Sequence, residues 1–173
     1  MTLDIITPAS TPDFDAVRLL CWDYRTFLLG LGPEDKKIIE FIYPPDKYER
    51  ILAAIEVDHQ APRGGVKLAM LGDRPVGCGM FHRLDNGAAE VKRVYVRDEA
   101  RGMGAGRAVM EALIDQCRAD GYERILMDTG VALAAAKSLY LSMGFNLRGP
   151  YQDMPDFADG RLLFFEMELE RGG

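Results

Sequence analysis

Residues 91–106 read VKRVYVRDEARGMGAG: an alternating, strand-like run, then a short charged segment, then three glycines at every second position. A helix that begins at Met103 or Gly104 leaves its first N–H groups without acceptors inside the helix. These amides and the helix dipole attract an anion, and glycine lets that anion approach the backbone closely. Arg101 and Arg107 add positive charge on either side. The stretch therefore predicts a pyrophosphate site, while a glycine-rich turn without a ligand is the alternative.

Two well-known phosphate-binding motifs do not fit this loop. A Walker A loop ends in Gly-Lys-Ser/Thr, whereas Gly106 is followed here by Arg107 and Ala108. The dinucleotide-binding pattern GxGxxG fails as well, because Arg107 stands where its third glycine belongs. A pyrophosphate site for some other nucleotide remains an open alternative at this point.

The chain as a whole has the size and composition of one globular domain. Its 173 residues are 48% hydrophobic and 28% charged, and we expect a single domain over residues 1–173. The net charge of −6 argues against nonspecific nucleic-acid binding. No run of about 18 uncharged apolar residues is present, and residues 1–15 lack the features of a secretory signal, so we expect no membrane association.

The cysteines and histidines point to a protein without a metal or a disulfide framework. Cys21, Cys78 and Cys117 are widely spaced, odd in number and contain no CxxC pair, which favours a reducing cytoplasm. His59 and His82 are the only two histidines and lie far apart in the sequence. We therefore expect no metal site and a cytoplasmic location.

Hydrophobic periodicity divides the chain into short strands and amphipathic helices. Asp85-Asn86-Gly87 is a strong hairpin signal between two of the strands. The expected strands are 3–7, 66–71, 76–83, 88–96, 124–128, 144–147 and 161–169, and the expected helices are 13–29, 46–58, 103–120 and 133–142. A three-strand meander followed by β-α-β-α-β predicts an α+β protein with a mixed sheet and helices on both faces.

Three pieces of sequence in this order resemble the GNAT N-acetyltransferase superfamily. Arg101–Gly106 fits its signature Arg/Gln-x-x-Gly-x-Gly/Ala, Glu90–Val96 precedes the loop, and Ala136-x-x-Leu139-Tyr140-x-x-x-Gly144-Phe145 follows it. The order of elements agrees over nearly the whole chain. The resemblance implies the GNAT acyl-CoA N-acyltransferase fold, which has a central mixed, mostly antiparallel sheet flanked by helices.

The resemblance also implies a binding site for coenzyme A. In this family the loop amides hold the pyrophosphate, and the preceding strand bulges so that its backbone pairs with the pantetheine arm. The corresponding positions here are Val94, Tyr95, Val96, Arg101, Gly102, Met103, Gly104, Ala105, Gly106 and Arg107. A backbone N–H of Val94 or Tyr95 would also stabilise the oxyanion. Many relatives carry an asparagine where this chain has Leu133, which puts that side-chain contact in doubt.

Catalytic roles follow from the same resemblance for Tyr140 and Glu90. Tyr140 corresponds to the tyrosine that protonates the CoA sulfur, and a phenol is a proton donor at neutral pH. A tyrosine packed in the core is the alternative interpretation. Glu90 corresponds to a strand carboxylate that serves as general base in several relatives, with a surface ion pair as its alternative and water acting alone as a third possibility.

The resemblance also implies where the acceptor binds, because in this family the acceptor pocket is usually built by the first two helices and the loop between the last strands. Tyr24 and Tyr151 are predicted to line it. Asp153 or Asp156 would attract an ammonium group, or Arg93 would bind a carboxylate of the acceptor, and the sequence does not choose between these. A simply solvated loop around Tyr151 is the alternative.

Together these features predict an acetyl-CoA-dependent N-acetyltransferase that transfers the acetyl group to a primary amine by direct attack in a ternary complex. The expected partner is a small-molecule or peptide amine, and a homodimer is possible because family members are often dimers. The alternative is a non-catalytic acyl-CoA-binding sensor or interaction module on the same fold.

Overall fold

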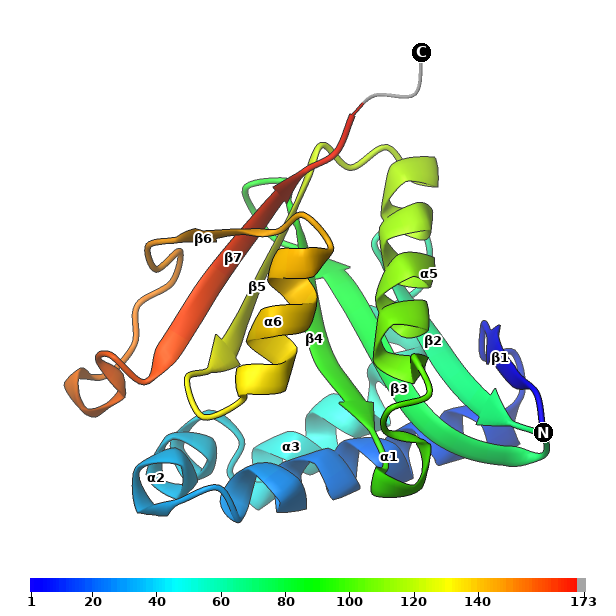
Figure 1. Cartoon of the computed structure of the whole chain (residues 1–173), viewed down its shortest axis with the longest axis horizontal. Coiled ribbons are helices and arrows are strands. Elements are labelled where there is room, and N and C mark those ends of the chain that lie inside the picture. The colour runs from blue at the N-terminus through cyan, green and yellow to red at the C-terminus, as the bar shows by residue number, and fades with distance from the viewer. Residues whose placement is uncertain (171–173) are drawn as a thin grey trace.

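A mixed sheet of seven strands forms the centre of the computed structural model, which describes residues 1–170 (Figure 1). The strands are β1 (Leu3–Ile6), β2 (Gly64–Leu71), β3 (Arg74–Arg83), β4 (Ala89–Val96), β5 (Arg124–Gly130), β6 (Asn146–Arg148) and β7 (Leu162–Glu168). Their order in the sheet is β1-β2-β3-β4-β5-β7-β6. Only the β4–β5 pair is parallel among the described pairs. The expected mixed, mostly antiparallel sheet is confirmed.

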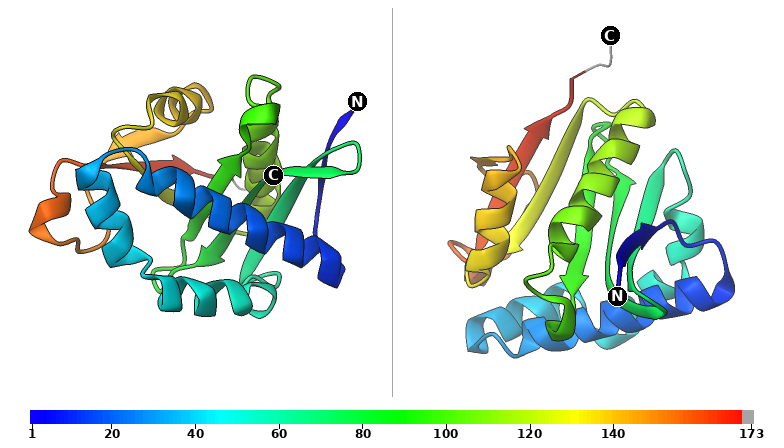
Figure 2. Two further views of the ribbon diagram at one scale, coloured as in Figure 1. Left: turned by 90° about the horizontal axis from the view of Figure 1, so that it is seen from below. Right: turned by 45° about the vertical axis from the view of Figure 1, so that its right-hand side comes forward.

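Helices cover both faces of this sheet. They are α1 (Thr11–Leu29), α2 (Pro33–Ile42), α3 (Pro45–Ala53), α4 (Ile55–Asp58), α5 (Ala105–Ala119) and α6 (Ala134–Ser142), with 3-10 turns η1 (Asp98–Ala100) and η2 (Asp156–Ala158). Figure 2 shows α1, α2 and α3 on one face and α5 and α6 on the other. Each face buries its own apolar cluster, so the sheet is sandwiched between two cores.

Helix α1 illustrates how local sequence sets an element. Ser10 caps its N-terminus, and its side chain accepts a hydrogen bond from the Asp13 amide at 3.3 Å, while Asp13 Oδ2 accepts one from the Ser10 amide at 3.2 Å. This reciprocal capping box satisfies two amides that the helix cannot pair internally. Val17, Leu20 and Cys21 recur on one face and are fully buried against the sheet.

The segment between α1 and α3 corrects the expected element order. We expected no helix between residues 29 and 46, but α2 occupies Pro33–Ile42. Its start carries proline at the first turn followed by Glu34 and Asp35, which favour a helix N-terminus. The expected helix over 46–58 is also divided, because α3 ends at Ala53 and α4 starts at Ile55.

A β-bulge in β4 opens the sheet beside β5. Cys78 pairs with Tyr95 and Met80 pairs with Lys92, so two residues of β4 lie opposite the single residue Gly79 of β3. One of the two, Arg93, has a positive φ of 53°. Such a bulge bends its strand and increases the local twist. Strands β4 and β5 pair only at Ala89 and Glu90 of β4, and Figure 1 shows the two strands diverging toward their C-terminal ends.

The helix that follows the bulge is held close to the sheet by Gly79. A Cβ atom at this position would lie 2.8 Å from Val109 Cγ1 and 3.0 Å from Leu113 Cδ1. A Cβ atom would lie closer to these methyl groups than van der Waals contact allows, so the side chains of α5 or the helix itself would have to shift. The position of α5, and of the glycine loop at its start, therefore depends on Gly79.

We expect Gly79→Ala to lower the free energy of unfolding by about 1–3 kcal/mol, because it overpacks the interface between β3 and α5. The measurement is urea denaturation followed by circular dichroism. Gly149→Ala is the matched control, since nothing lies within 4 Å of a Cβ there, and it should shift stability by less than about 0.5 kcal/mol. Equal stability of the two variants would contradict this account of how α5 is placed.

Candidate active site

A cavity of about 460 Å³ lies where β4 diverges from β5. It is bounded by the end of β4, the glycine loop, the start of α5, α6 and two aromatic residues of α1, Tyr24 and Phe27. We call it the loop cavity. Nine of the ten residues predicted to bind coenzyme A line it. The exception is Met103, whose side chain is 46% exposed and lies outside the lining.

The glycines of the loop leave its backbone open to this cavity. Gly102 and Gly104 both have a φ of +79°, a conformation that side chains with a Cβ rarely adopt. No atom lies within 4 Å of the place that a Cβ would take at either position. Gly104 also forms the N-cap of α5 and provides no side-chain cap. The first amides of this helix are therefore free to bind an anion.

Two arginines are fixed at the rim of the loop cavity. The guanidinium of Arg101 lies 4.8 Å from the centre of the Phe27 ring, pairs with Asp98, and donates from Nε to the Val96 carbonyl oxygen at 3.2 Å. Arg107 donates from Nη2 to Ser142 Oγ at 2.7 Å. These contacts hold both side chains beside the open helix terminus, where Arg107 has a neutral partner and the charge of Arg101 is shared with Asp98.

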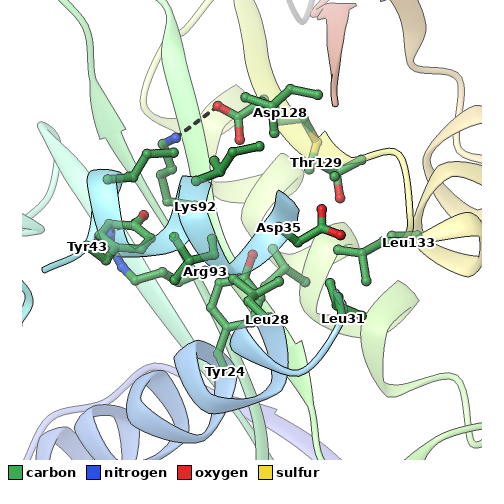
Figure 3. A pocket seen from close by; sticks show the side chains of 18 of the residues that line it. Tyr24, Leu28, Leu31, Asp35, Tyr43, Lys92, Arg93, Asp128, Thr129 and Leu133 are labelled. Atoms are coloured by element: carbon green, nitrogen blue, oxygen red, sulfur yellow. Dashed lines mark hydrogen bonds and ion pairs between the residues drawn. The ribbon is translucent and has the colours of Figure 1, made fainter. Parts of the chain in front are cut away.

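A smaller, more enclosed cavity adjoins the first one on the side of α2 (Figure 3). It has a volume of about 100 Å³, and we call it the inner cavity. Helices α1 and α2 and the segment between them supply an apolar wall that includes Leu28, Leu31, Ile38, Ile39 and Ile42. Polar side chains reach it from α2, β4 and β5, namely Asp35, Lys92, Arg93, Asp128 and Thr129. Five residues line both cavities: Tyr24, Val94, Leu133, Ala136 and Tyr140.

Tyr140 lies where the two cavities meet. It is 5% exposed, and its ring packs edge-on against Phe145 and Phe165, with ring centres 6.0 and 5.6 Å away. Burial, and secondarily the negative charge of Asp128, raises the pKa of the Tyr140 phenol above its usual value. The hydroxyl therefore stays protonated at neutral pH and is suited to donate a proton at this junction.

The carboxylates that face the inner cavity are paired with cations. Lys92 Nζ lies 3.1 Å from Asp128 Oδ2, the contact drawn in Figure 3, and 3.7 Å from Glu90 Oε2. Burial by itself lowers the pKa of Lys92, but the negative charges of Asp128 and Glu90 and the hydrogen bond to Asp128 act together to raise it, so the ammonium form is retained. On the other wall Arg161 Nη2 lies 3.0 Å from Asp35 Oδ2. Both acidic residues are thus neutralised within the protein.

Arg93 is a cation without a carboxylate partner. Its side chain lines the inner cavity, runs beside Tyr43 in Figure 3, and is only 7% exposed. It donates from Nη1 to Tyr43 Oη at 3.3 Å and from Nε to Met80 Sδ at 3.2 Å. Among residues 1–170 no aspartate or glutamate oxygen lies within 4 Å of its guanidinium nitrogens. Tyr24 and Arg93, both predicted acceptor residues, therefore lie on this cavity.

Glu90 and Tyr151 are brought together, but outside both cavity linings. Tyr151 Oη donates to Glu90 Oε2 at 2.7 Å, and His82 Nε2 lies 2.8 Å from Glu90 Oε1. Burial by itself raises the pKa of Glu90, but the hydrogen bond to His82 and the charge of Lys92 bring it below its usual value. The roles of Glu90 as a base and of Tyr151 as an acceptor contact stay predictions.

The lowered pKa of Glu90 predicts a pH-dependent contribution to stability. Because the folded state binds this proton less tightly than the unfolded state, the contribution is present above the unfolded pKa of about 4.3. It is lost as the pH falls through the lower pKa of the folded state. Glu90→Gln should therefore lower the free energy of unfolding by about 1.5–3 kcal/mol at pH 7, with a smaller difference from the unsubstituted protein at pH 3.

Urea denaturation at the two pH values measures this difference. Glu49→Gln on the exposed side of α3 is the control, and it should behave like the unsubstituted protein at both. A difference for Glu90→Gln that stays constant between pH 7 and pH 3 would show that its ionisation does not contribute to stability.

Several residues of the site had not been singled out from the sequence. Asp35, Asp128 and Thr129 carry the polar groups of the inner cavity, and α2 supplies much of its apolar wall. Asp153 and Asp156 instead line a separate cavity of about 660 Å³ between the β6–β7 connection and β7. Within residues 1–170, no group of three or more histidine, cysteine or acidic side chains is arranged to hold a metal. The described helices include none with the length and apolarity needed to cross a membrane.

Comparisons with known proteins agree with this geometry. The family model described as "Acetyltransferase (GNAT) family" matches residues 15–145. The chain is 32% identical over 146 residues to "IAA acetyltransferase" of Azospirillum brasilense, a match that covers 80% of this chain and 94% of that protein. Matches to three relatives named uncharacterized N-acetyltransferases span 37–56% of those proteins.

Solved structures show the same fold. A GNAT-family acetyltransferase from Staphylococcus aureus Mu50 superposes with a TM-score of 0.73 at 20% identity, covering 98% of this chain and 100% of that one. YncA from Salmonella typhimurium, solved with its cofactor acetyl-CoA, gives a TM-score of 0.71 at 22% identity over 100% of this chain and 97% of its own. With the family model matching most of its length, the chain belongs to the acetyltransferase (GNAT) family.

Proposed function

We propose that the protein is an N-acetyltransferase that uses acetyl-CoA and transfers the acetyl group directly to a primary amine. The observation that carries the proposal is the junction of the two cavities. An anion-binding helix terminus opens into the loop cavity, and a buried phenol, Tyr140, lies where that cavity meets an enclosed pocket for a second substrate. This arrangement suits the meeting of two substrates before any group is transferred.

The residues around the loop cavity fit coenzyme A. The open amides after Gly102 and Gly104 would hold the pyrophosphate, with Arg101 and Arg107 adding charge. The edge of β4 that no longer pairs with β5 would bind the pantetheine amides as an added strand does. Leu133, which replaces a frequent asparagine, lines both cavities and would give this arm an apolar contact instead.

The chemistry needs one new bond and two proton movements. Acetyl-CoA supplies the activated acetyl group as a thioester. The amine nitrogen forms a bond to the acetyl carbon while the carbon–sulfur bond breaks, and a backbone N–H of Val94 or Tyr95 stabilises the negative charge on the carbonyl oxygen. Tyr140 Oη gives its proton to the departing sulfur, which leaves as a thiol.

The proton of the incoming ammonium passes to the carboxylates around Lys92. Asp128 lies on the wall of the inner cavity and is the nearer acceptor, whereas Glu90 contacts the other side of the Lys92 ammonium at 3.7 Å. In this scheme Asp128 accepts the proton first. A water molecule would then pass it to Glu90, which does not line the cavity itself. As the amide forms, its nitrogen loses a second proton, which passes through water to the Tyr140 phenolate, and the carboxylate releases the first proton to solvent, so both groups return to their starting states.

The inner cavity favours a small-molecule acceptor over a peptide. It is lined by residues of α1, α2, β4 and β5 and is more enclosed than the loop cavity, which leaves little room for an extended chain. Its volume of about 100 Å³ is well below the ~300–1,000 Å³ of common ligand pockets, which restricts the acceptor to a compact molecule. The buried, free state of all three cysteines fits the cytoplasmic location that we propose, and a homodimer stays a prediction.

Release of free thiol from acetyl-CoA over a panel of small amines tests the proposal, with mass spectrometry of the acetylated product. The expected result is amine-dependent thiol release together with a product heavier by one acetyl group. Calorimetry with coenzyme A accompanies the assay. Tight binding of coenzyme A without transfer to any amine would point to an acyl-CoA sensor and overturn the enzymatic role.

A further inference from the structure

The charge balance of the inner cavity leaves one cation without a counter-ion. Lys92 is neutralised by Asp128, and Asp35 is neutralised by Arg161. Arg93 has only two neutral partners, a phenol oxygen and a thioether sulfur. A guanidinium remains charged in proteins, and a buried charge without a partner is unfavourable. The free protein therefore keeps an unmatched positive charge at the wall of the cavity.

The guanidinium also has donors to spare. Of its five N–H groups, Nε and one on Nη1 are used by Met80 and Tyr43. Within residues 1–170 Nη2 makes no hydrogen bond, and it is not completely buried. Arg93 is among the residues that line the inner cavity, and its guanidinium lies at the edge of that cavity beside Tyr43. A carboxylate matches both the charge and the paired donor geometry.

We propose that the acceptor is a compact amino acid whose carboxylate is bound by Arg93. This proposal rests on the proposed acetyltransferase function and specifies its substrate class. In this arrangement the carboxylate lies at Arg93 and the amino group is directed toward the junction of the two cavities, which Tyr140 and Val94 line. An α-amino acid, in which two bonds separate the nitrogen from the carboxylate carbon, carries both groups in a molecule compact enough for a cavity of about 100 Å³.

The apolar wall of the inner cavity indicates what kind of side chain the acceptor carries. Leu28, Ile38 and Ile42 form an apolar surface opposite the charged strands. Such a surface favours a short aliphatic side chain, because burying a polar or charged group there would leave it without a partner. The site then recognises the acceptor by one charged contact and by apolar fit.

Matched acceptors test this with the unsubstituted protein. L-alanine and L-valine are compared with their amides and with the amines that lack the carboxylate altogether, ethylamine and isobutylamine. We expect kcat/KM for the free amino acids to exceed that for each analogue by at least about 100-fold, because the analogues leave the buried guanidinium unpaired. Equal acetylation of the amines and amides would overturn the carboxylate site while leaving the acetyltransferase function intact.

Substitutions assign the effect to Arg93. Arg93→Met should raise KM for the amino acid at least about 30-fold with a smaller change in kcat, and Arg93→Lys should recover part of it, because the charge is retained but the forked geometry is lost. Arg118→Met, on the exposed side of α5, is the control and should change nothing. Unchanged coenzyme A affinity shows that the variants are folded. An Arg93→Met variant with an unchanged KM would overturn the proposal.

Binding without turnover separates the two proposals. Calorimetry of L-alanine and L-valine in the presence of coenzyme A, which has no acetyl group to transfer, reports the carboxylate site alone. Binding that depends on Arg93 without acetylation would retain the site and overturn the proposed reaction. Absence of binding by either amino acid, with transfer to other amines, would overturn the carboxylate site only.

Discussion

Tyr140→Phe is expected to lower kcat by about 10²–10⁴-fold, the usual contribution of a positioned proton donor. The phenol is 5% exposed at the junction of the two cavities, and burial holds its pKa above the usual value, so it is protonated when the thiolate departs. Phenylalanine keeps the ring contacts to Phe145 and Phe165. Steady-state thiol release at saturating substrates is the measurement, with the Kd of coenzyme A expected within about twofold of the original.

Tyr122→Phe is the matched control for the loss of a buried hydroxyl. Its Oη donates to the Pro62 carbonyl oxygen at 2.6 Å, and it lines neither the loop cavity nor the inner cavity. This variant should lose about 0.5–1.5 kcal/mol of stability and keep its turnover. Unchanged turnover in Tyr140→Phe would remove Tyr140 from the chemistry and leave it as a packing residue.

Gly104→Val is expected to weaken coenzyme A binding by about 10–150-fold, which corresponds to the loss of one charge-assisted hydrogen bond. The added side chain would fill the space in front of the open helix terminus, where nothing now lies within 4 Å. The φ of +79° also disfavours a branched residue, so the loop would shift its amides away from the anion or lose about 1–2 kcal/mol of stability. Calorimetry with coenzyme A measures the affinity.

Gly121, at the other end of α5, provides the control for the backbone strain that a substitution at Gly104 introduces. Gly121 has a φ of +85° and equally open surroundings, but it follows the C-terminus of α5. Gly121→Val should lose comparable stability and bind coenzyme A normally. If both variants weaken binding equally, the effect comes from destabilising α5, and the glycine loop is not the anion site.

The fold was predictable where local sequence patterns agree with one another. The three-strand meander follows from alternating residues and from the Asp85-Asn86-Gly87 turn, and α5 follows from a continuous apolar stripe closed by Gly121. Helix α2 was missed although Pro33 and its acidic first turn are helix-start signals. Gly30 and Gly32 directly before it suggested a loop, and its ten residues are too few for periodicity to outweigh them.

The loop residues were predictable because their function depends on backbone conformation. An anion site at a helix terminus needs glycines and neighbouring cations within a few positions of the chain, so its signal is local. The sequence also indicated Tyr24, Arg93 and Tyr140, and all three lie on the inner cavity. By contrast, Met103, which lies between Gly102 and Gly104, is exposed and does not line the loop cavity.

Only the tertiary structure decided which polar and charged side chains from distant parts of the chain contact each other. Tyr151 reaches Glu90 across 61 positions of the chain, and Arg161 reaches Asp35 across 126. No local pattern encodes such contacts, because they depend on which strands become neighbours and on where a bulge turns a side chain. The sequence by itself determined an acetyltransferase fold with an anion-binding loop. The folded chain decided which carboxylates are neutralised internally, and it left Arg93 as the cation available to an acceptor.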